Sequence, residues 1–404
     1  MKILTIVGAR PQFIKAATVS RAIAAHNARI SSVQQLTNNR SRITELIIHT
    51  GQHFDDNMSQ VFFDELDIPK PDYNLGIGGG SHGRNTGRMI EAIEDVLLDE
   101  KPDWVLVYGD TDSTLAGALA AAKLHIPVAQ VEAGLRSYNR RMPEEINRVL
   151  TDHAASLLFA PTKTAVENLR KEGFSIIQNG TLSQPVQPSP LVINIGDVMY
   201  DAALFYAAKA EQHSTIIQFL GLTPKKYVLA TVHRAENRDD PKRLAAIITA
   251  LTEISRDIPV ILPLHPRTRK QMEYFKLFSE ASSLEPGPLE LGPGINFVDP
   301  LGYLDMVMLE KNAAQIATDS GGVQKEAFFH GVPCVTLRDE TEWVELVDLG
   351  WNRLAAPHSA QEIVKVAREA MNANPVGDAS PYGKGDSAHM IVKVLLERGG
   401  GPCV

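Results

Sequence analysis

The chain has 404 residues, of which 44% are hydrophobic and 22% charged, a normal globular composition whose length suits two domains better than one core. Its formal net charge of −8 and pI of about 5.9 disfavour a broad electrostatic grip on nucleic acid or an anionic membrane. Its two cysteines form neither a disulfide framework nor a CxxC motif, and Cys334, in the apolar run VPCVTL, is expected to be a buried strand residue.

The N-terminal residues MKILTIVGARP are apolar over only a short stretch and lack the layout of a signal peptide. No apolar run in the sequence approaches the length of a membrane span. We therefore expect a soluble, cytoplasmic protein that binds neither nucleic acid nor membranes.

Short β-branched runs alternate with helical patterns along the whole chain, which is typical of doubly wound parallel sheets. Predicted strands form a first series at residues 2–8, 45–50, 104–109, 127–132 and 156–161, and a second series at residues 226–232, 258–264, 295–299, 313–319 and 332–337. Helical patterns separate them, for example at residues 87–100 and 114–124. The predicted fold class is α/β, with two Rossmann-like domains.

The stretch TLSQPVQPSP, residues 181–190, is rich in Pro, Ser and Gln and is predicted to be a loop between the two series. We place the first domain at residues 1–191 and the second at 192–380. A last helical pattern in residues 381–404 is expected to pack back on the first domain. Two parallel-sheet domains imply a cleft, with ligands beyond the carboxyl ends of the strands.

The motif GARPQFIK, residues 8–15, follows the first predicted strand and brings Arg10 and Lys15 near a helix start. Two cations at the end of a strand suit a diphosphate group. Solvated charges on an amphipathic helix would explain the motif equally well.

Carboxylates lie at the ends of two neighbouring strands of the first series and at the start of the next helix. YGDTDST places Asp110 at one strand end, VEAGLRS places Glu132 and Arg136 at the next, and RRMPEEINR adds Glu144 and Glu145. Three carboxylates gathered in one cleft are costly unless some are paired or protonated, and such an arrangement is typical of acid/base catalysis.

Simpler structural roles remain open for two of these acids. Asp110 could cap the helix that follows it, and Glu145 could pair with Arg148 three residues later.

The second series contributes two His-Arg pairs. TVHRAEN places His233 and Arg234 at a strand end, and LHPRTRK does the same for His265 and Arg267. One histidine at a strand end is usually structural, but two pairs at successive strand ends indicate a site facing the first domain.

The motif TDSGGVQKEA, residues 318–327, joins an apolar strand to a helix. Backbone N–H groups at a helix start that carries Gly321 and Gly322 would form a seat for an anion such as phosphate, and Glu326 could accept hydrogen bonds from sugar hydroxyls. The structural alternative is a Ser320 or Asp319 cap, with glycines for close helix–strand packing.

Two further motifs are predicted not to carry the function that they suggest. GGGSHG, residues 78–83, satisfies G-x-G-x-x-G but does not follow the first strand of a βαβ unit, so a dinucleotide site is not expected. HTGQH, residues 49–53, spaces two histidines by four on a strand and loop, so zinc is not expected.

With these motifs in order, the chain resembles the non-hydrolysing UDP-N-acetylglucosamine 2-epimerases almost from end to end. The shared motifs are GARPQFIK, HTGQH, YGDTDSTLA, VEAGLRS, MPEEINRVLTDH, HRAEN, LHPRTRK, TDSGGVQKEA and GVPCVTLRDETE. The resemblance implies two domains of the glycosyltransferase-B type, a UDP-sugar in the cleft, a homodimer, and no metal or other cofactor.

The resemblance also implies roles for individual residues. Arg10 and His233 would approach the diphosphate, Ser320 and Gly321 would seat phosphate, and Glu326 would hold the ribose. The catalytic set would comprise Lys15, Asp110, Glu132, Glu144 and His233, and further substrate ligands would be Arg136, His265 and Gly322.

The family reaction explains why several acid/base groups are needed. The hydrogen at C2 of the sugar is not next to a carbonyl, so its direct removal and return is very hard. In the family, UDP instead leaves C1 as C2 is deprotonated, and then adds back to the resulting 2-acetamidoglucal while C2 is protonated on the opposite face. Such chemistry requires proton transfer on both faces of the sugar and stabilisation of the departing UDP.

The chain departs from the classical family pattern at an activator site. Gln52 and His53 match two of its residues, but the place of a following Arg-Gln pair is taken by the GGGSHG loop. Similar features occur in a branch acting on UDP-2,3-diacetamido-2,3-dideoxyglucuronate. The extra carboxylate of that substrate would require a cation, for which Arg84, Arg88, Arg140 and Arg141 are candidates.

Rival functions of the same fold remain open. A UDP-sugar glycosyltransferase would need an acceptor groove, and the three-carboxylate cluster disfavours it. A hydrolysing epimerase would release UDP and free N-acetylmannosamine. A non-catalytic UDP-sugar sensor would bind UDP without loss of the C2 hydrogen.

Overall fold

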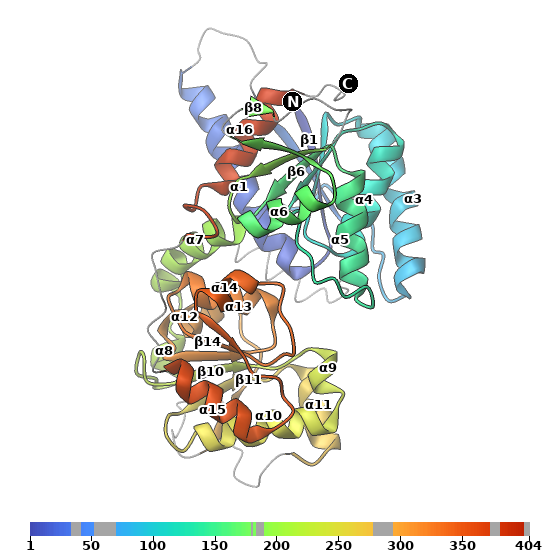
Figure 1. Ribbon diagram of the computed structural model, residues 1–404. Helices are drawn as coiled ribbons and strands as arrows, with labels where there is room; N and C mark the ends of the chain where they lie inside the picture. Colours follow the sequence, from blue (N-terminus) through green and yellow to red (C-terminus); the bar gives the residue numbers. More distant parts are fainter. Residues whose placement is uncertain are drawn as a thin grey trace. The chain divides into compact units, whose positions relative to one another are not determined.

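The computed structural model describes residues 1–33, 42–51, 70–178, 181–182, 190–277, 294–371 and 380–399. The chain forms two units, one of Met1–Ala202 with Ser380–Val404 and one of Ala203–Ala379, and the division falls within helix α7 (Val198–His213) (Figure 1). Among the described residues, no helix combines the length and apolarity needed to cross a membrane.

Within the described residues, the first unit is built on a nine-stranded sheet with the order β3-β2-β1-β4-β5-β6-β9-β7-β8. Every neighbouring pair is parallel except the short antiparallel pair β7 and β8. The strands are β1 (Lys2–Val7), β2 (Thr44–His49), β3 (Tyr73–Asn74), β4 (Trp104–Tyr108), β5 (Val128–Val131), β6 (Leu157–Ala160), β7 (Ser175–Gln178), β8 (Thr181–Leu182) and β9 (Leu191–Asn194).

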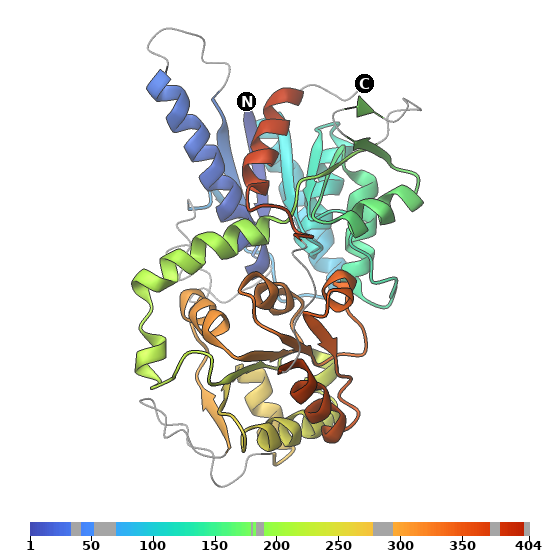
Figure 2. The same ribbon diagram turned by 60° about the vertical axis from the view of Figure 1, so that its left-hand side comes forward.

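Helices cover both faces of this sheet. On one face, α1 (Arg10–Val33) lies beside α16 (Ser387–Arg398), seen in Figure 2 as a blue helix next to a red one. On the other face, α3 (His82–Glu100), α4 (Asp112–Lys123) and α5 (Pro143–Ala154) form a row. Helix α6 (Lys163–Lys171) connects β6 to β7.

In the part of the second unit that the structure describes, six strands form an entirely parallel sheet with the order β12-β11-β10-β13-β14-β15. Its strands are β10 (Val228–Thr231), β11 (Val260–Pro263), β12 (Ile295–Val298), β13 (Gln315–Thr318), β14 (Cys334–Thr336) and β15 (Asn352–Leu354). Its helices are α8 (Ile216–Phe219), α9 (Ala235–Arg238), α10 (Pro241–Ile254), α11 (Pro266–Tyr274), α12 (Tyr303–Asn312), α13 (Gly321–Phe329), α14 (Val344–Asp348) and α15 (Ala360–Met371).

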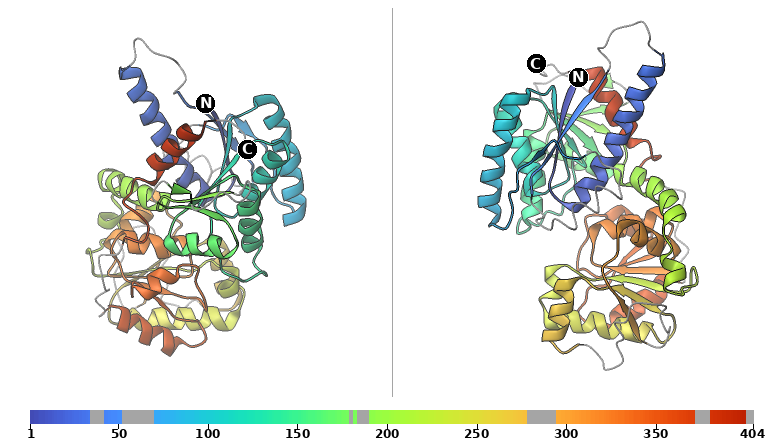
Figure 3. Two further views of the ribbon diagram at one scale, coloured as in Figure 1. Left: turned by 45° about the horizontal axis from the view of Figure 1, so that its top comes forward. Right: turned by 180° about the vertical axis from the view of Figure 1, so that it is seen from behind.

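Side-chain alternation along the strands of the second unit divides its core between the two faces of the sheet. Val228 and Ala230 join a core with α10 and α15, whereas Leu229 joins a core with α8 and α12. The two helix layers are visible in both views of Figure 3. Cys334 is fully buried on β14, as predicted.

In both sheets, the direction of chain progression reverses at a central strand. After β1 the chain moves outward through β2 and β3 and then returns to β4 on the other side of β1. The same reversal separates β10 from β13 in the second unit. Ligands of open α/β sheets bind beyond the carboxyl ends of strands at such switch points.

The predicted α/β class with two doubly wound parallel sheets is confirmed. The predicted strands of both series are present, with shorter bounds except for β2, which is shifted by one residue. Strands β3, β7, β8, β9 and β15 were not predicted, and β8 lies in the stretch predicted to be a loop. These strands are too short for a clear periodic pattern. The sequence-based boundary after residue 191 falls inside β9, and the first unit extends to Ala202 because β9 pairs with β6.

Candidate active site

The carboxyl ends of β1 and β4 are tied together by Gln12, a buried residue in the first turn of α1. Its Oε1 accepts hydrogen bonds from the N–H groups of Gly8 at 2.8 Å and Ala9 at 2.9 Å. Its Nε2 donates to the Tyr108 carbonyl and to Thr114 Oγ1, both at 2.9 Å. Gln12 therefore holds the backbone that precedes Asp110 against the loop that leads into α1.

A buried ion pair lies beside this junction. Lys15 Nζ, on the second turn of α1, contacts Glu132 Oε2 at the end of β5, and the two side chains are only 7% and 8% exposed. Glu132 has a φ of +71°, a left-handed conformation that is uncommon for a residue other than glycine and that concentrates at functional sites. Gly109 directly follows β4, and a Cβ on it would lie 3.3 Å from Lys15 Nζ and 3.4 Å from Glu132 Oε2. The carboxyl end of β4 therefore lies next to the ion pair.

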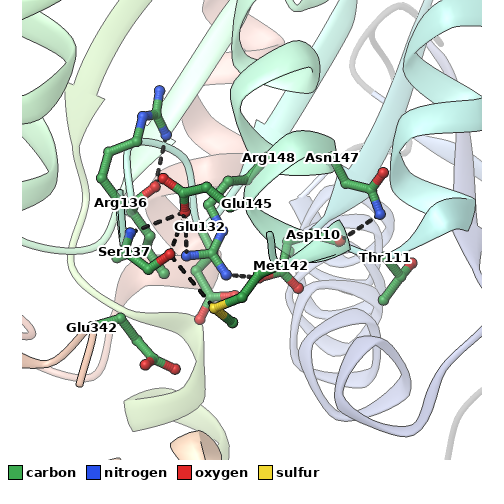
Figure 4. Close-up of polar contacts among 12 residues, drawn as sticks. Asp110, Thr111, Glu132, Arg136, Ser137, Met142, Glu145, Asn147, Arg148 and Glu342 are labelled. Atoms are coloured by element: carbon green, nitrogen blue, oxygen red, sulfur yellow. Dashed lines mark hydrogen bonds and ion pairs between the residues drawn. The ribbon is translucent and has the colours of Figure 1, made fainter. Parts of the chain in front are cut away.

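Asp110 belongs to the same electrostatic cluster. Its carboxylate contacts the Arg148 guanidinium from α5, and its backbone carbonyl accepts a hydrogen bond from Asn147 at 3.1 Å (Figure 4). The pKa of Asp110 is raised, chiefly because the carboxyl is removed from water. The positive charges of Arg148 and Lys15 lower this pKa, whereas the negative charges of Glu132 and Glu144 raise it. Asp110, Glu132 and Lys15 therefore lie together within the first unit, and Glu144 is close enough to affect the pKa of Asp110.

The two structural alternatives have different outcomes. Thr111, and not Asp110, caps α4, since its side chain accepts a hydrogen bond from the Thr114 N–H. The second alternative is correct, because Glu145 Oε2 lies 3.3 Å from Arg148 Nη1.

Glu145 also organises the loop before α5. Its carboxylate accepts hydrogen bonds from the Ser137 N–H, Ser137 Oγ and the Tyr138 N–H, all at 2.9 Å (Figure 4). Glu144, the preceding residue, is exposed. Of the two adjacent acids, Glu145 is hydrogen-bonded to the loop, whereas Glu144 is exposed to solvent.

Arg136 was predicted to bind substrate, and its observed contacts argue against that role. Its guanidinium is 1% exposed; it binds Asp152 Oδ2 at 2.7 Å and both carboxylate oxygens of Glu172 at 2.7 Å. Nη1 also donates to the Leu135 carbonyl at 2.7 Å. All of these contacts lie inside the first unit, so Arg136 is a structural residue, and we do not propose it as a substrate ligand.

In the second unit, the buried carboxylate of Asp319 joins two strand ends. It accepts hydrogen bonds from the N–H groups of His233 at 3.1 and 3.2 Å and Arg234 at 3.1 Å, and from Asn237 Nδ2 at 3.1 Å. His233 Nδ1 lies 3.3 Å from Asp319 Oδ1, while the imidazole is 47% exposed. Asp319 thus fixes both the HRAEN loop after β10 and the orientation of the His233 ring.

The TDSGG motif follows the predicted strand–helix transition. Ser320 is the N-cap of α13, with Oγ accepting from the Val323 N–H at 3.5 Å. A Cβ on Gly321 would meet Glu342 Oε1 at 2.6 Å, whereas a Cβ on Gly322 would meet only Ser320 Oγ at 3.9 Å. Glu326 is buried and accepts a hydrogen bond from Tyr303 Oη at 3.2 Å.

His265 caps α11, because its Nδ1 accepts a hydrogen bond from the Arg267 N–H at 3.2 Å. Burial lowers the pKa of His265, and the nearby charges of His233, Arg267 and Arg238 lower it further. The two predicted histidines therefore lie in one cationic region at the ends of β10 and β11.

Three predicted residues receive no structural test. The side chain of Arg10 is not described, and Gln52 and His53, assigned to an activator site, lie outside the described residues. Conversely, sequence reasoning missed Gln12 and Arg148 as partners of the cluster, and it considered Asp319 only as a helix cap. Their roles depend on partners distant in the sequence, and only the strand-end position of Asp319 hinted at its role.

Replacing Asp319 with Asn should loosen both loops. The amide would present a donor where the carboxylate accepts several N–H groups, so we expect the free energy of unfolding to fall by about 1–3 kcal/mol. Urea unfolding would measure this effect. Asp299→Asn is the control, because Asp299 is 78% exposed in a surface pair with Arg269. Equal results for both variants would contradict the role of Asp319.

The two doubly wound sheets and the charged clusters at their strand ends define an α/β protein of the glycosyltransferase-B type. Residues 35–396 match the family described as UDP-N-acetylglucosamine 2-epimerase. The chain belongs to this family, whose members are isomerases.

Individual relatives cover almost the whole chain. It is 50% identical to the UDP-2,3-diacetamido-2,3-dideoxy-D-glucuronate 2-epimerase of Pseudomonas aeruginosa, over 98% of this chain and 100% of the relative. It is 42% identical to the UDP-N-acetylglucosamine 2-epimerase of Methanocaldococcus jannaschii, over 98% of this chain and 99% of the relative. A crystal structure of the M. jannaschii UDP-GlcNAc 2-epimerase in complex with UDP-GlcNAc and UDP is similar, with a TM-score of 0.81 and 43% identity over 98% of this chain and 100% of that one.

Proposed function

We propose that the chain catalyses reversible, non-hydrolysing epimerisation at C2 of a UDP-2-acetamido sugar. The observation that carries this proposal is the buried Lys15–Glu132 pair beside Asp110, an acid/base cluster at a switch point, in a chain of this family. Membership of the family supplies the reaction type, and the cluster supplies the groups that it requires.

The reaction proceeds by elimination and re-addition. A base removes the proton at C2 while the C1–O bond breaks and its electron pair leaves with UDP, giving a 2-acetamidoglucal with a C1–C2 double bond. A diphosphate oxygen of UDP then bonds to C1 again, and an acid delivers a proton to the opposite face of C2. Atoms and electrons balance without an oxidant or reductant.

Proton transfer is assigned to Asp110, Glu132 and Glu144 as a group. The raised pKa of Asp110 favours a carboxyl that can hold and release a proton. Lys15 contacts the neighbouring Glu132 and supplies positive charge to the site.

Binding of UDP is assigned to the second unit together with Arg10. His233 and Arg10 would contact the diphosphate, and His265 would add a hydrogen bond to the ligand. The N-terminus of α13, with Ser320, Gly321 and Gly322, would seat a phosphate group. Glu326 would accept hydrogen bonds from the ribose. This assignment is supported by the open space around Gly322 and by the exposure of His233.

Two substrates fit the proposal, UDP-N-acetylglucosamine, giving UDP-N-acetylmannosamine, and UDP-2,3-diacetamido-2,3-dideoxyglucuronate. The chain is 50% identical both to the P. aeruginosa enzyme and to a UDP-N-acetylglucosamine 2-epimerase homolog of Methanococcus maripaludis, so both sugars enter the test. We further propose that the protein works in the cytoplasm as a homodimer.

The proposal is tested by incubating each substrate with the protein in deuterated water and following the sugar by NMR. We expect deuterium at C2 and a mixture of the two C2 epimers, both still attached to UDP. Free sugar and free UDP would instead identify a hydrolysing enzyme. Absence of deuterium at C2 with both substrates would refute the proposal.

A further inference from the structure

The glycine-rich segment GIGGGSHG, residues 76–83, has no role in the mechanism above. It joins β3 to α3, and Gly76 and Gly79 have φ values of +59° and +73°, in the left-handed region that favours glycine. A Cβ on Gly79 would meet no atom within 4 Å, so the segment leaves open space on that side.

The end of this segment is fixed by helix α3. Asn85 is buried and bonds both sides of Gly80, since its Oδ1 accepts from the Gly80 N–H at 3.1 Å and its Nδ2 donates to the Gly80 carbonyl at 3.2 Å. The Thr86 hydroxyl donates to the His82 carbonyl at 2.8 Å. These hydrogen bonds hold the backbone on both sides of Ser81 and so fix the position from which the His82 side chain extends.

The imidazole of His82 is held by a buried acid. Its Nδ1 lies 2.8 Å from Oδ2 of Asp112, and the two side chains are 70% and 6% exposed. Among the residues that the structure describes, Asp112 is the one hydrogen-bond partner of this imidazole. A carboxylate that accepts from Nδ1–H fixes the tautomer and the ring orientation, which leaves Nε2 directed to another partner.

Asp112 connects His82 to the catalytic cluster. Its second oxygen accepts a hydrogen bond from Asn147 Nδ2 at 3.1 Å, and the same Nδ2 donates to the Asp110 carbonyl at 3.1 Å. Three hydrogen bonds thus join His82 to the backbone of Asp110 within the first unit. An isolated surface His–Asp pair contributes little to stability, so stability alone does not account for a buried acid shared in this way.

We propose that His82 is a further substrate-binding residue, whose Nε2 hydrogen-bonds a polar group, hydroxyl or carboxylate, of the sugar attached to UDP. Asp112 is its positioning residue. The inference rests on the proposed function, because the sugar must lie at the Asp110 cluster for C2 chemistry to occur there. Neutral imidazole would accept from a hydroxyl at Nε2, and the charged form would donate to a carboxylate.

The test compares His82→Ala with His389→Ala, which removes another exposed histidine of the same unit, on α16. We expect His82→Ala to lower kcat/KM by about 10- to 100-fold, mainly through KM, because one hydrogen bond to the sugar is lost. The affinity of His82→Ala for UDP alone should equal that of the wild type, since UDP lacks the acetamido sugar that His82 would bind. His389→Ala should behave like the wild type in both assays.

Asp112→Asn should also lower kcat/KM. The double variant should have the same kcat/KM as His82→Ala, because both substitutions disrupt the same hydrogen bond between His82 and the sugar. Thermal unfolding of each variant checks that the fold is kept. A wild-type kcat/KM for His82→Ala, an equal loss of UDP affinity, or additive effects in the double variant would each overturn the inference. A wild type that does not exchange deuterium at C2 would overturn the proposed function itself.

Discussion

Asp110→Asn is expected to lower kcat by about 10²- to 10⁴-fold, the range typical of a lost general acid or base. Asn keeps the shape of the side chain and can still accept a hydrogen bond from Arg148, but it neither gains nor releases a proton. The loss should therefore fall on proton transfer at C2. Binding of UDP is expected to persist, because the residues assigned to the nucleotide lie in the second unit and at Arg10.

Two measurements separate chemistry from folding and binding. Deuterium incorporation at C2 should slow in parallel with epimerisation, and titration with UDP should remain close to the wild type. Asp103→Asn is the matched control, since Asp103 precedes the other end of β4 and accepts a hydrogen bond from the Lys2 N–H at 2.6 Å. The control should retain full turnover.

Glu132→Gln and Glu144→Gln should produce losses of the same order. In Glu132→Gln, Lys15 would also lose its buried partner, so this variant should be less stable than the other two. Near-wild-type turnover in all three variants would show that the cluster has been misassigned.

Arg136→Met is expected to destabilise the protein by about 3–5 kcal/mol, the usual cost of removing one partner of a buried ion pair. Asp152 would remain fully buried without its guanidinium partner, and Glu172 would lose a two-point contact. The midpoint of urea unfolding and hydrogen exchange of the amides of β5 and β6 would report the loss.

The destabilisation should depend on pH. Burial raises the pKa of Asp152 to about 6 even though Arg136 and the Gly134 N–H lower it, so the carboxyl is ionised at neutral pH. Without Arg136, its pKa in the folded state rises further above the unfolded value. A raised carboxyl pKa means that folding binds a proton, and the associated stability is lost as pH rises towards the folded pKa. The difference between variant and wild type should therefore widen above pH 6.

The control for this experiment is Arg170→Met. Arg170 and Glu167 form an exposed pair on α6 with Nη1 to Oε2 at 3.2 Å, and we expect its loss to cost less than about 1 kcal/mol. If Arg136→Met cost no more than the control, or if the difference did not change with pH, the buried network would not have the role given to it here.

The sequence by itself determined the fold class and the places where chemistry could occur. Alternating strand and helix patterns define two parallel sheets, and the ends of parallel strands meet at one edge. Asp110, Glu132 and His233 were identified for this reason, since Glu132 ends a predicted strand and the other two directly follow one. Family motifs then led to the prediction of an epimerase site at these positions, and the family match shows that the chain belongs to that family.

Only the tertiary structure decided what each charged side chain contacts. Arg136 looked like a ligand from its motif, yet its partner Glu172 lies 36 residues away and keeps it buried. Asp319 looked like a helix cap, yet it binds the backbone of His233, 86 residues away. His82 was part of an apparently idle glycine-rich loop until Asp112, 30 residues on, oriented its ring. Hydrogen bonds act over about 3 Å in space, whereas sequence spacing reports only neighbours on one element.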